Sequence, residues 1–149
     1  MPDKVAVAAD HGGFELKTSL LPELKTLGLE PLDLGTDSLE SVDYPDFAQK
    51  VARAVEEGRA KWGLLICGTG IGMSIAANRF PGVRAANAHD GLTARLARQH
   101  NDANVLTLGG RILGLEEAKD CVRNFFSAKF EGGRHARRVA KLSSAKVPS

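Results

Sequence analysis

Short apolar runs alternate with amphipathic stretches along most of the chain. Residues 4–10, KVAVAAD, are a β-rich apolar run that leads into the polar residues Asp10 and His11, which is typical of a buried strand and its exit loop. Leucines then recur at near-helical spacing until Gly28, and Pro22 within that segment predicts a kink or a restart of the helix. The pattern therefore begins with a strand followed by a helix.

The same alternation continues to the C-terminus. Further strands are expected at 29–35, 63–67, 83–88 and 104–110, and further helices at 46–58, 73–78, 92–100, 115–126 and from about Gly133 onward. Alternating strands and helices are typical of a parallel sheet covered on both faces. The prediction is one α/β domain over 1–149: a three-layer αβα sandwich around a doubly wound, Rossmann- or flavodoxin-like sheet of about five strands, with a C-terminal helix and a flexible tail over 143–149.

In such sheets, ligands bind outside the carboxyl ends of the strands, at the point where the winding reverses. If the strand order is 2-1-3-4-5, this point lies between the first and third strands. The loops that follow these two strands are DHGG (10–13) and CGTGIG (67–72). We therefore expect the two chemically richest segments of the chain to be neighbours.

Composition excludes several classes of protein. Hydrophobic residues make up 43% and charged residues 26% of the chain, which is ordinary for a soluble globular protein. No apolar run approaches the ~20 residues of a membrane span, and two cysteines are too few for a disulfide framework. We expect a cytoplasmic protein without a membrane partner.

The positive charge is concentrated at the C-terminus. The net charge is +2, but residues 134–149 hold five basic and no acidic residues, which leaves 15 basic and 18 acidic residues in 1–133. This segment is suited to an anionic ligand or an RNA contact, or it is a solvated tail. One Trp and one Tyr provide little surface for stacking bases, so no nucleic-acid partner is expected.

The glycines of residues 68–72 follow a strand and precede a helix. Backbone N–H groups can approach an anion in such a loop, but a tight strand-to-helix turn without a ligand is the alternative. The third glycine comes one residue too early for a dinucleotide fingerprint, and no GK[ST] follows. Cys67, where the loop begins, is either a reactive thiolate or a small buried hydrophobic residue, whereas Cys121 fits the core side of a helix.

Basic side chains provide further candidates. His100 ends a predicted helix, where it can act chemically or only pair with the helix dipole. Arg134 and Arg138 share a helix face and can clamp one phosphate, and Arg111 after the fifth strand can join them. The four histidines show neither HxH nor HExxH spacing, so no metal site is predicted.

Five motifs, collinear over residues 4–142, resemble those of the type B ribose-5-phosphate isomerases of the RpiB/LacAB sugar-phosphate isomerase family. They are ADHGGFELK, VDYPDFAQKVA, ICGTGIGMSIAAN, RQHNDANVLTLGGR and EGGRHARRV. The resemblance implies interconversion of ribose 5-phosphate and ribulose 5-phosphate without metal or coenzyme. It also implies a homodimer, or a dimer of dimers, whose subunits share active sites.

The resemblance also implies roles for single residues. Cys67 matches the general base of the cysteine-bearing branch; another branch uses a glutamate a few residues later, near where Ile75 stands here. His100 matches the residue that helps to open the furanose ring, and Thr69 is assigned to the catalytic group with these two. The residues that match substrate-binding positions are Asp10, His11, Gly68, Thr69, Gly70, Ile71, Gly72, Asn101, Arg111, Arg134, His135 and Arg138.

Two alternatives remain open at this point. The same chemistry on a six-carbon substrate, allose 6-phosphate or galactose 6-phosphate, needs nearly the same motifs. A nucleotide-binding regulatory module is the alternative from another class, and the misplaced third glycine counts against it.

Overall fold

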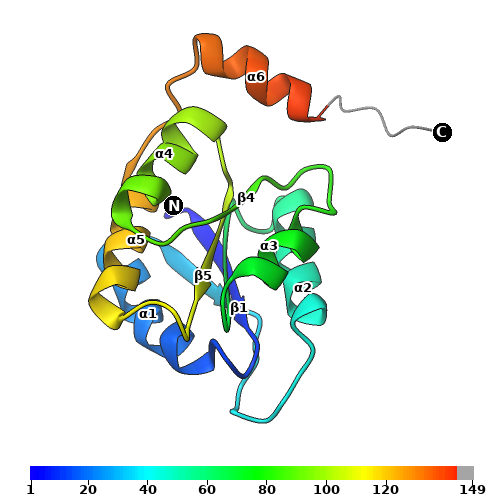
Figure 1. Ribbon diagram of the computed structural model, residues 1–149, viewed down its shortest axis with the longest axis vertical. Helices are drawn as coiled ribbons and strands as arrows, with labels where there is room; N and C mark the ends of the chain where they lie inside the picture. Colours follow the sequence, from blue (N-terminus) through cyan, green and yellow to red (C-terminus); the bar gives the residue numbers. More distant parts are fainter. Residues whose placement is uncertain (144–149) are drawn as a thin grey trace, which may run out of the picture.

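Five parallel strands form one sheet, and helices cover both of its faces (Figure 1). The computed structural model describes residues 1–143. Of the tail expected over 143–149, it therefore describes only Ser143, which ends the last helix; the rest of that prediction lies outside the described residues. The elements are β1 (Lys4–Ala9), α1 (Phe14–Thr26), β2 (Glu30–Asp33), α2 (Tyr44–Glu56), β3 (Trp62–Cys67), α3 (Ile71–Ala77), β4 (Ala85–Asn87), α4 (Gly91–Asn101), β5 (Val105–Gly109), α5 (Leu115–Ser127) and α6 (Arg134–Ser143).

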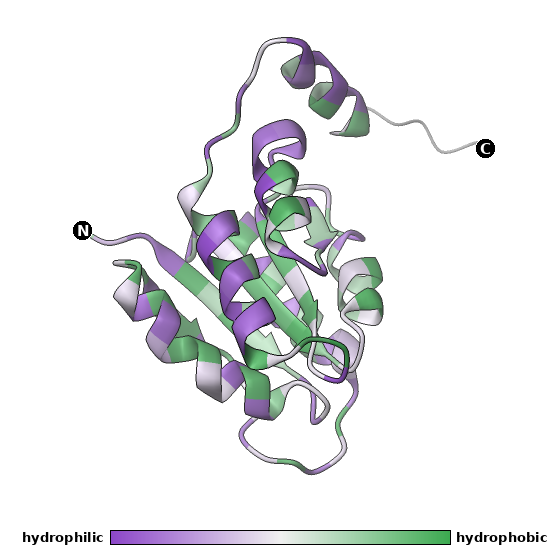
Figure 2. Cartoon of the chain, turned by 60° about the vertical axis from the view of Figure 1, so that its left-hand side comes forward, coloured by the Kyte–Doolittle hydropathy of each residue, from purple (hydrophilic) through white to green (hydrophobic). Residues whose placement is uncertain are grey.

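The three-layer αβα sandwich is confirmed, and its two faces have separate hydrophobic cores. Helices α1, α4 and α5 pack on one face, where Leu20 and Phe125 are fully buried against Val7 of β1. Helices α2 and α3 pack on the other face, where Val51 and Met73 are fully buried. In Figure 2 the hydrophobic residues gather in the strands and on the inward sides of the helices.

The strand order is β2-β1-β3-β5-β4, so the expected order 2-1-3-4-5 is wrong for the last two strands. Parallel crossovers are right-handed, so the face that a helix covers decides the direction in which the next strand is added. Helix α3 lies on the same face as α2 and carries the chain outward to β4. Helix α4 lies on the opposite face and brings the chain back, which inserts β5 between β3 and β4. The apolar β5 is fully buried, whereas the short β4 is half-buried at the edge.

Two further features concern the helices. Helix α1 continues through Pro22 without the expected restart. Helix α6 packs on α4 and stands away from the sheet in Figure 1. Within residues 1–143, no helix combines the length and the hydropathy required of a membrane-crossing segment.

Candidate active site

The loops that follow β1 and β3 touch each other, as predicted from the winding of the sheet. Strands β1 and β3 are adjacent, and the backbone of Gly12 lies so close to the β3 loop that an added Cβ would be 3.2 Å from the amide nitrogen of Gly68. The changed order of β4 and β5 does not affect this, because the reversal of winding still falls between β1 and β3.

Cys67 is the last residue of β3 and lies at the boundary between the core and the glycine loop. It is 5% exposed and packs among the buried residues of the α2–α3 face, and its Sγ accepts a hydrogen bond from the backbone N–H of Gly70 at 3.1 Å. Cys121 is fully buried in α5, where burial raises the pKa of its thiol to about 11. Its expected place in the core is confirmed.

The glycine loop presents backbone donors beside this thiol. Gly70 has φ of +81°, in the left-handed region that glycine adopts without strain. The N–H groups of Gly70 and Ile71 donate to Cys67 Sγ and Thr69 Oγ1. Within the described residues, the N–H groups of Gly68, Thr69 and Gly72 make no hydrogen bond. The loop can therefore supply donors to an oxyanion.

Asp10 and His11 directly follow β1, in the segment that meets the glycine loop at Gly12. Asp10 is 8% exposed, and its Oδ1 accepts a hydrogen bond from the N–H of Gly12 at 2.9 Å. The Nδ1 of His11 accepts a hydrogen bond from the N–H of Val42 at 3.2 Å. An imidazole that accepts at Nδ1 carries its proton on Nε2, so His11 can donate that proton to a ligand oxygen.

Arg111 brings a positive charge to the same loop. Its N–H donates to the carbonyl of Gly68 at 3.0 Å, and the preceding Gly110 donates to the carbonyl of Cys67 at 2.8 Å. These bonds hold the start of the β5 exit loop against the β3 loop. A Cβ added to Gly68 would lie 3.3 Å from Nη1 of Arg111, so the guanidinium lies beside Gly68.

Two polar contacts that were not predicted from the sequence support this region. The fully buried Thr107 donates from Oγ1 to Asn87 Oδ1 at 3.1 Å, and Asn87 abuts the backbone of Gly70. The available signal in the sequence was that Asn87 and Thr107 are polar residues within two predicted strands. Lys17, 1% exposed, donates to Asp33 Oδ1 at 2.7 Å and to the carbonyl of Thr36 at 2.8 Å, which ties α1 to the segment after β2.

A second group of polar side chains lies where α4 meets α6. His100 and Asn101 end α4, and together with His135 and Arg138 of α6 they line a hollow of about 310 Å³. The rings of His100 and His135 stack with centroids 4.3 Å apart and planes 9° apart. Burial and the positive charges of His100 and Arg134 lower the pKa of His135.

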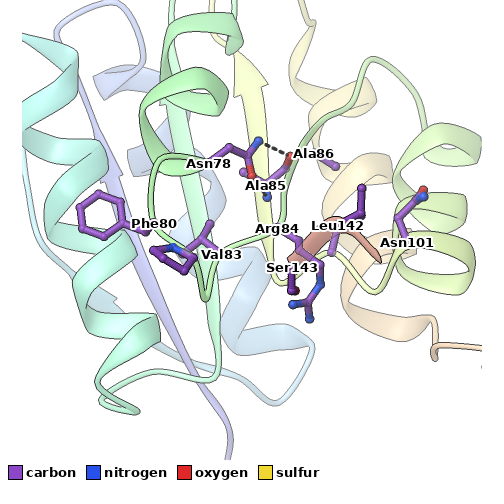
Figure 3. Close-up of a pocket in the computed structure, with 11 residues that line it drawn as sticks. Asn78, Phe80, Val83, Arg84, Ala85, Ala86, Asn101, Leu142 and Ser143 are labelled. Atoms are coloured by element: carbon purple, nitrogen blue, oxygen red, sulfur yellow. Dashed lines mark hydrogen bonds between the residues drawn. The ribbon is translucent and has the colours of Figure 1, made fainter. Parts of the chain in front are cut away.

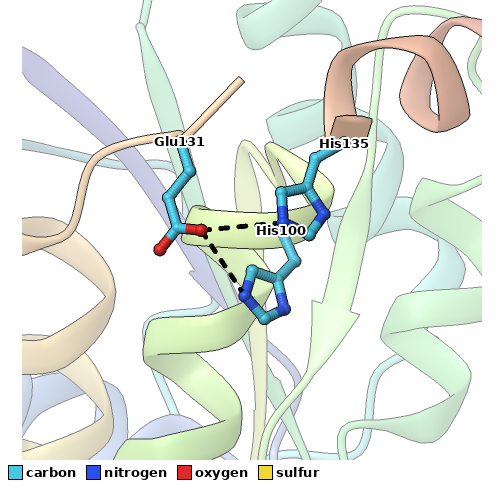
Figure 4. A group of neighbouring side chains, drawn as sticks. All are labelled: His100, Glu131 and His135. Atoms are coloured by element: carbon cyan, nitrogen blue, oxygen red, sulfur yellow. Dashed lines mark ion pairs between the residues drawn. The ribbon is translucent and has the colours of Figure 1, made fainter. Parts of the chain in front are cut away.

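Glu131 lies beside both rings, as Figure 4 shows, and sequence analysis did not predict it. Its Oε1 is 3.7 Å from Nε2 of His100 and 3.6 Å from Nε2 of His135. Within residues 1–143, these are the three side chains whose ligand atoms lie close enough together to share a metal ion, all within 4.8 Å. Nearly parallel rings, however, direct their nitrogen lone pairs side by side rather than toward one point. The arrangement therefore fits histidine–carboxylate ion pairs better than metal coordination.

The two groups lie at opposite ends of the sheet. In Figure 1 the ends of β1 and β5 point away from α6, whereas α4 runs back toward α6. One copy of the chain therefore brings Cys67 together with Asp10, His11 and Arg111, and brings His100 together with Asn101, His135 and Arg138. It does not bring Cys67 and His100 together.

A further hollow, of about 450 Å³, adjoins the second group (Figure 3). Asn101 and Leu142 line both hollows. On the far side, Asn78 joins the end of α3 to β4: it donates to the carbonyl of Ala85 at 3.0 Å and accepts from the N–H of the same residue at 2.8 Å. These two bonds hold the edge strand β4 on the side that does not pair with β5.

A doubly wound sandwich with a thiol, backbone donors and a guanidinium at the winding reversal has a site suited to a small anionic molecule. Comparison with known proteins identifies the kind of enzyme. Residues 5–142 match the family described as Ribose/Galactose Isomerase. The chain is 48% identical to ribose-5-phosphate isomerase B of Escherichia coli (strain K12) over 141 residues, 95% of each chain.

Solved structures agree with this assignment. Ribose-5-phosphate isomerase B of Clostridium thermocellum superposes with a TM-score of 0.93 at 51% identity over 95% of both chains. The enzyme of Mycoplasma genitalium with bound ribulose-5-phosphate superposes with a TM-score of 0.91 at 44% identity, over 95% of this chain and 94% of that one. This chain belongs to the Ribose/Galactose Isomerase family, and it is an isomerase.

Proposed function

We propose that this protein interconverts ribose 5-phosphate and ribulose 5-phosphate, with Cys67 as the general base and His100 of a second copy as the group that opens the furanose ring. The names of its relatives support the reaction. The observation that carries the role of Cys67 is the 3.1 Å contact between its Sγ and the N–H of Gly70. This contact supports the role, because the sulfur atom and backbone N–H donors lie within one short segment.

The chemistry requires both parts of that loop. A base removes the proton from C2 of the open-chain aldose while negative charge builds on the oxygen at C1, and the proton then returns to C1 to give the ketose. Cys67, as the thiolate, takes this proton. The N–H groups of Gly68, Thr69 and Gly72 stabilise the enediolate, and loss of one such donor typically costs about 10²–10³ in rate. The bonding electrons stay within the substrate, so the step needs no coenzyme.

The remaining roles follow from the two groups of side chains. Asp10 and His11 of one copy and Asn101 of the other contact the sugar hydroxyls. The phosphate is held by Arg111 of one copy and by three residues of α6 in the other. Those residues are Arg134, His135 and Arg138.

A homodimer, or a dimer of dimers, joins the two groups. Two-fold symmetry lets the α4–α6 end of one copy meet the glycine loop of the other, and the reverse contact forms at the same time. Exposed apolar side chains support this arrangement: Ile71 and Ile75 of α3 are 53% and 57% exposed, and Leu142 of α6 is 60% exposed. A cytoplasmic location is part of the proposal, since the relatives are metabolic enzymes.

Subunit complementation tests the roles and the sharing together. Cys67→Ala and His100→Asn homo-oligomers, each inactive, are mixed and refolded. In a shared site, every mixed dimer has one intact pair of residues, so random mixing restores about a quarter of the wild-type activity. No recovery would show that Cys67 and His100 do not act across the interface.

A six-carbon sugar phosphate is the second candidate substrate, because the description of the matched family names galactose as well as ribose. Steady-state assays on ribose 5-phosphate, allose 6-phosphate and galactose 6-phosphate side by side test this choice. We expect the highest kcat/KM for ribose 5-phosphate. The nucleotide-binding module considered from the sequence receives no support from the comparisons.

A further inference from the structure

Glu131 is an isolated negative charge in a basic part of the molecule. From Cys121 to the C-terminus it is the one acidic residue in the sequence. It lies in the connection between α5 and α6, and its backbone N–H donates to the carbonyl of Gln99 at 3.0 Å. Glu131 is therefore tied directly to the last turn of α4, next to His100.

The side chain of Glu131 turns toward the stacked histidines (Figure 4). Its Oε1 is almost equidistant from the Nε2 atoms of His100 and His135, at 3.7 and 3.6 Å. These distances fit ion pairs rather than direct hydrogen bonds. The side chain of His135 is 10% exposed, whereas that of His100 is 37% exposed, so His100 is the ring of the pair that is open to a ligand.

Glu131 stands among positive charges. The charged groups near the stacked rings of His100 and His135 are Arg134 and Arg138, and Glu131 is the carboxylate that lies beside both rings. The stacked ring of His100 and the nearby guanidiniums disfavour a proton on His135. A carboxylate at equal distance from both rings offsets this repulsion and favours one orientation of the pair.

We propose that Glu131 is a positioning residue for ring opening: it holds His100 against His135 and supplies the negative charge that lets His100 exchange a proton with the ring oxygen of the sugar. This inference rests on the proposed function, in which His100 opens the ring. The competing idea is that Glu131 occupies the phosphate site as an internal anion. The backbone tie to Gln99 favours the positioning role, because it fixes Glu131 to the helix that carries His100.

The experiment separates ring closure from proton transfer. Ribulose 5-phosphate cannot close a furanose ring, because the phosphate occupies its C5 oxygen. Uptake of deuterium from solvent at its C1 therefore reports enediolate formation alone, whereas its conversion to ribose 5-phosphate also includes ring closure. For Glu131→Gln in the full-length enzyme, we expect conversion to fall about tenfold while the exchange rate stays near that of the wild type.

Two variants complete the design. Glu131→Asp keeps the charge and should recover part of the conversion. Glu57→Gln removes another exposed, ion-paired glutamate, the partner of Arg59 at 2.8 Å, and should change neither rate. An equal loss of exchange and conversion in Glu131→Gln, or no loss of either, overturns the proposal. A lower KM for the sugar phosphate in Glu131→Gln, with unchanged kcat, also overturns the proposal. It would show that Glu131 competes with the substrate phosphate for its site.

His100→Asn separates this inference from the proposed function. If His100→Asn slows conversion more than exchange but Glu131→Gln does not, the role of Glu131 is wrong and the role of His100 stands. If neither Glu131→Gln nor His100→Asn changes the rate of conversion, the roles of both Glu131 and His100 are wrong.

Discussion

The Sγ of Cys67 and the backbone N–H of Gly70 form a hydrogen bond of 3.1 Å at the carboxyl end of β3. The contact joins the end of a buried strand to a loop in which the N–H groups of Gly68, Thr69 and Gly72 have no acceptor among the described residues. Strand β3 is central in the sheet and holds this loop rigidly against the exit loops of β1 and β5. The thiol and the donors therefore keep a fixed geometry, which is what enediolate chemistry requires.

Cys67→Ala should remove proton transfer without removing substrate binding. The expected result is a fall in kcat of about 10²–10⁴, the usual contribution of a general base. Calorimetric titration should still detect ribose 5-phosphate, since Arg111 and the arginines of α6 are unchanged. Cys121→Ala is the control: it should lower the melting temperature by leaving a cavity in α5 but retain kcat. Near wild-type turnover in Cys67→Ala would exclude this thiol as the base.

Gly70→Ala should damage both the loop and the reaction. Alanine at φ of +81° costs roughly 1–2 kcal/mol, and its Cβ would also approach Asn87 and the carbonyl carbon of Leu108, the latter at 2.9 Å. Gly58→Ala is a matched control, because Gly58 has φ of +75° and open space around the added Cβ. Both variants should unfold at lower urea concentration, but only Gly70→Ala should also lose kcat. Equal kcat in the two variants would contradict a role for the loop geometry.

Arg134→Ala should act mainly on substrate binding. A hydrogen bond between charged groups contributes about 1.5–3 kcal/mol, so KM should rise roughly tenfold to a hundredfold while kcat changes little. Arg137→Ala removes the same charge from the same helix, but Arg137 is not among the charges that lower the pKa of His135, whereas Arg134 is. A similar KM in both variants would show that α6 acts only through its overall charge.

Local patterns in the sequence were sufficient to predict the elements and the meeting of the two loops. Apolar runs such as 63–67 and 104–110 are short and are ended by glycines, so they predict buried strands. The positions of β4 and β5 could not be predicted in this way. They depend on which face of the sheet α4 covers, and this depends on packing between elements that are distant in the sequence.

The site was predictable where chemistry coincides with a motif. Cys67 and the glycines stand together in the sequence and also in the structure. Glu131 and Lys17 were not predictable, because each acts through a partner on another element. In the sequence, Lys17 is typical of an exposed helix position, but in the structure the segment after β2 buries it. Glu131 is typical of a solvated connection in the sequence, but in the structure it lies beside His135 of α6.

His135 should make stability depend on pH in the weakly acidic range. Burial, His100 and Arg134 lower its pKa below the ordinary value of 6.5, so the unfolded chain binds the proton more tightly than the folded one. Stability is therefore complete above about pH 6.5 and falls as the pH drops toward the lowered pKa. Melting temperatures between about pH 5 and 7.5 should show this slope in the wild type and a flatter one in His135→Gln. His89→Gln, an exposed histidine, should keep the wild-type slope. The negative charge of Glu131 raises the pKa of His135 and so opposes the lowering by burial and positive charge. Glu131→Gln should therefore lower the pKa of His135 further, which an NMR titration of its ring protons can measure. A pKa of His135 at or above 6.5 in the wild type would contradict the burial and the charges described for this ring.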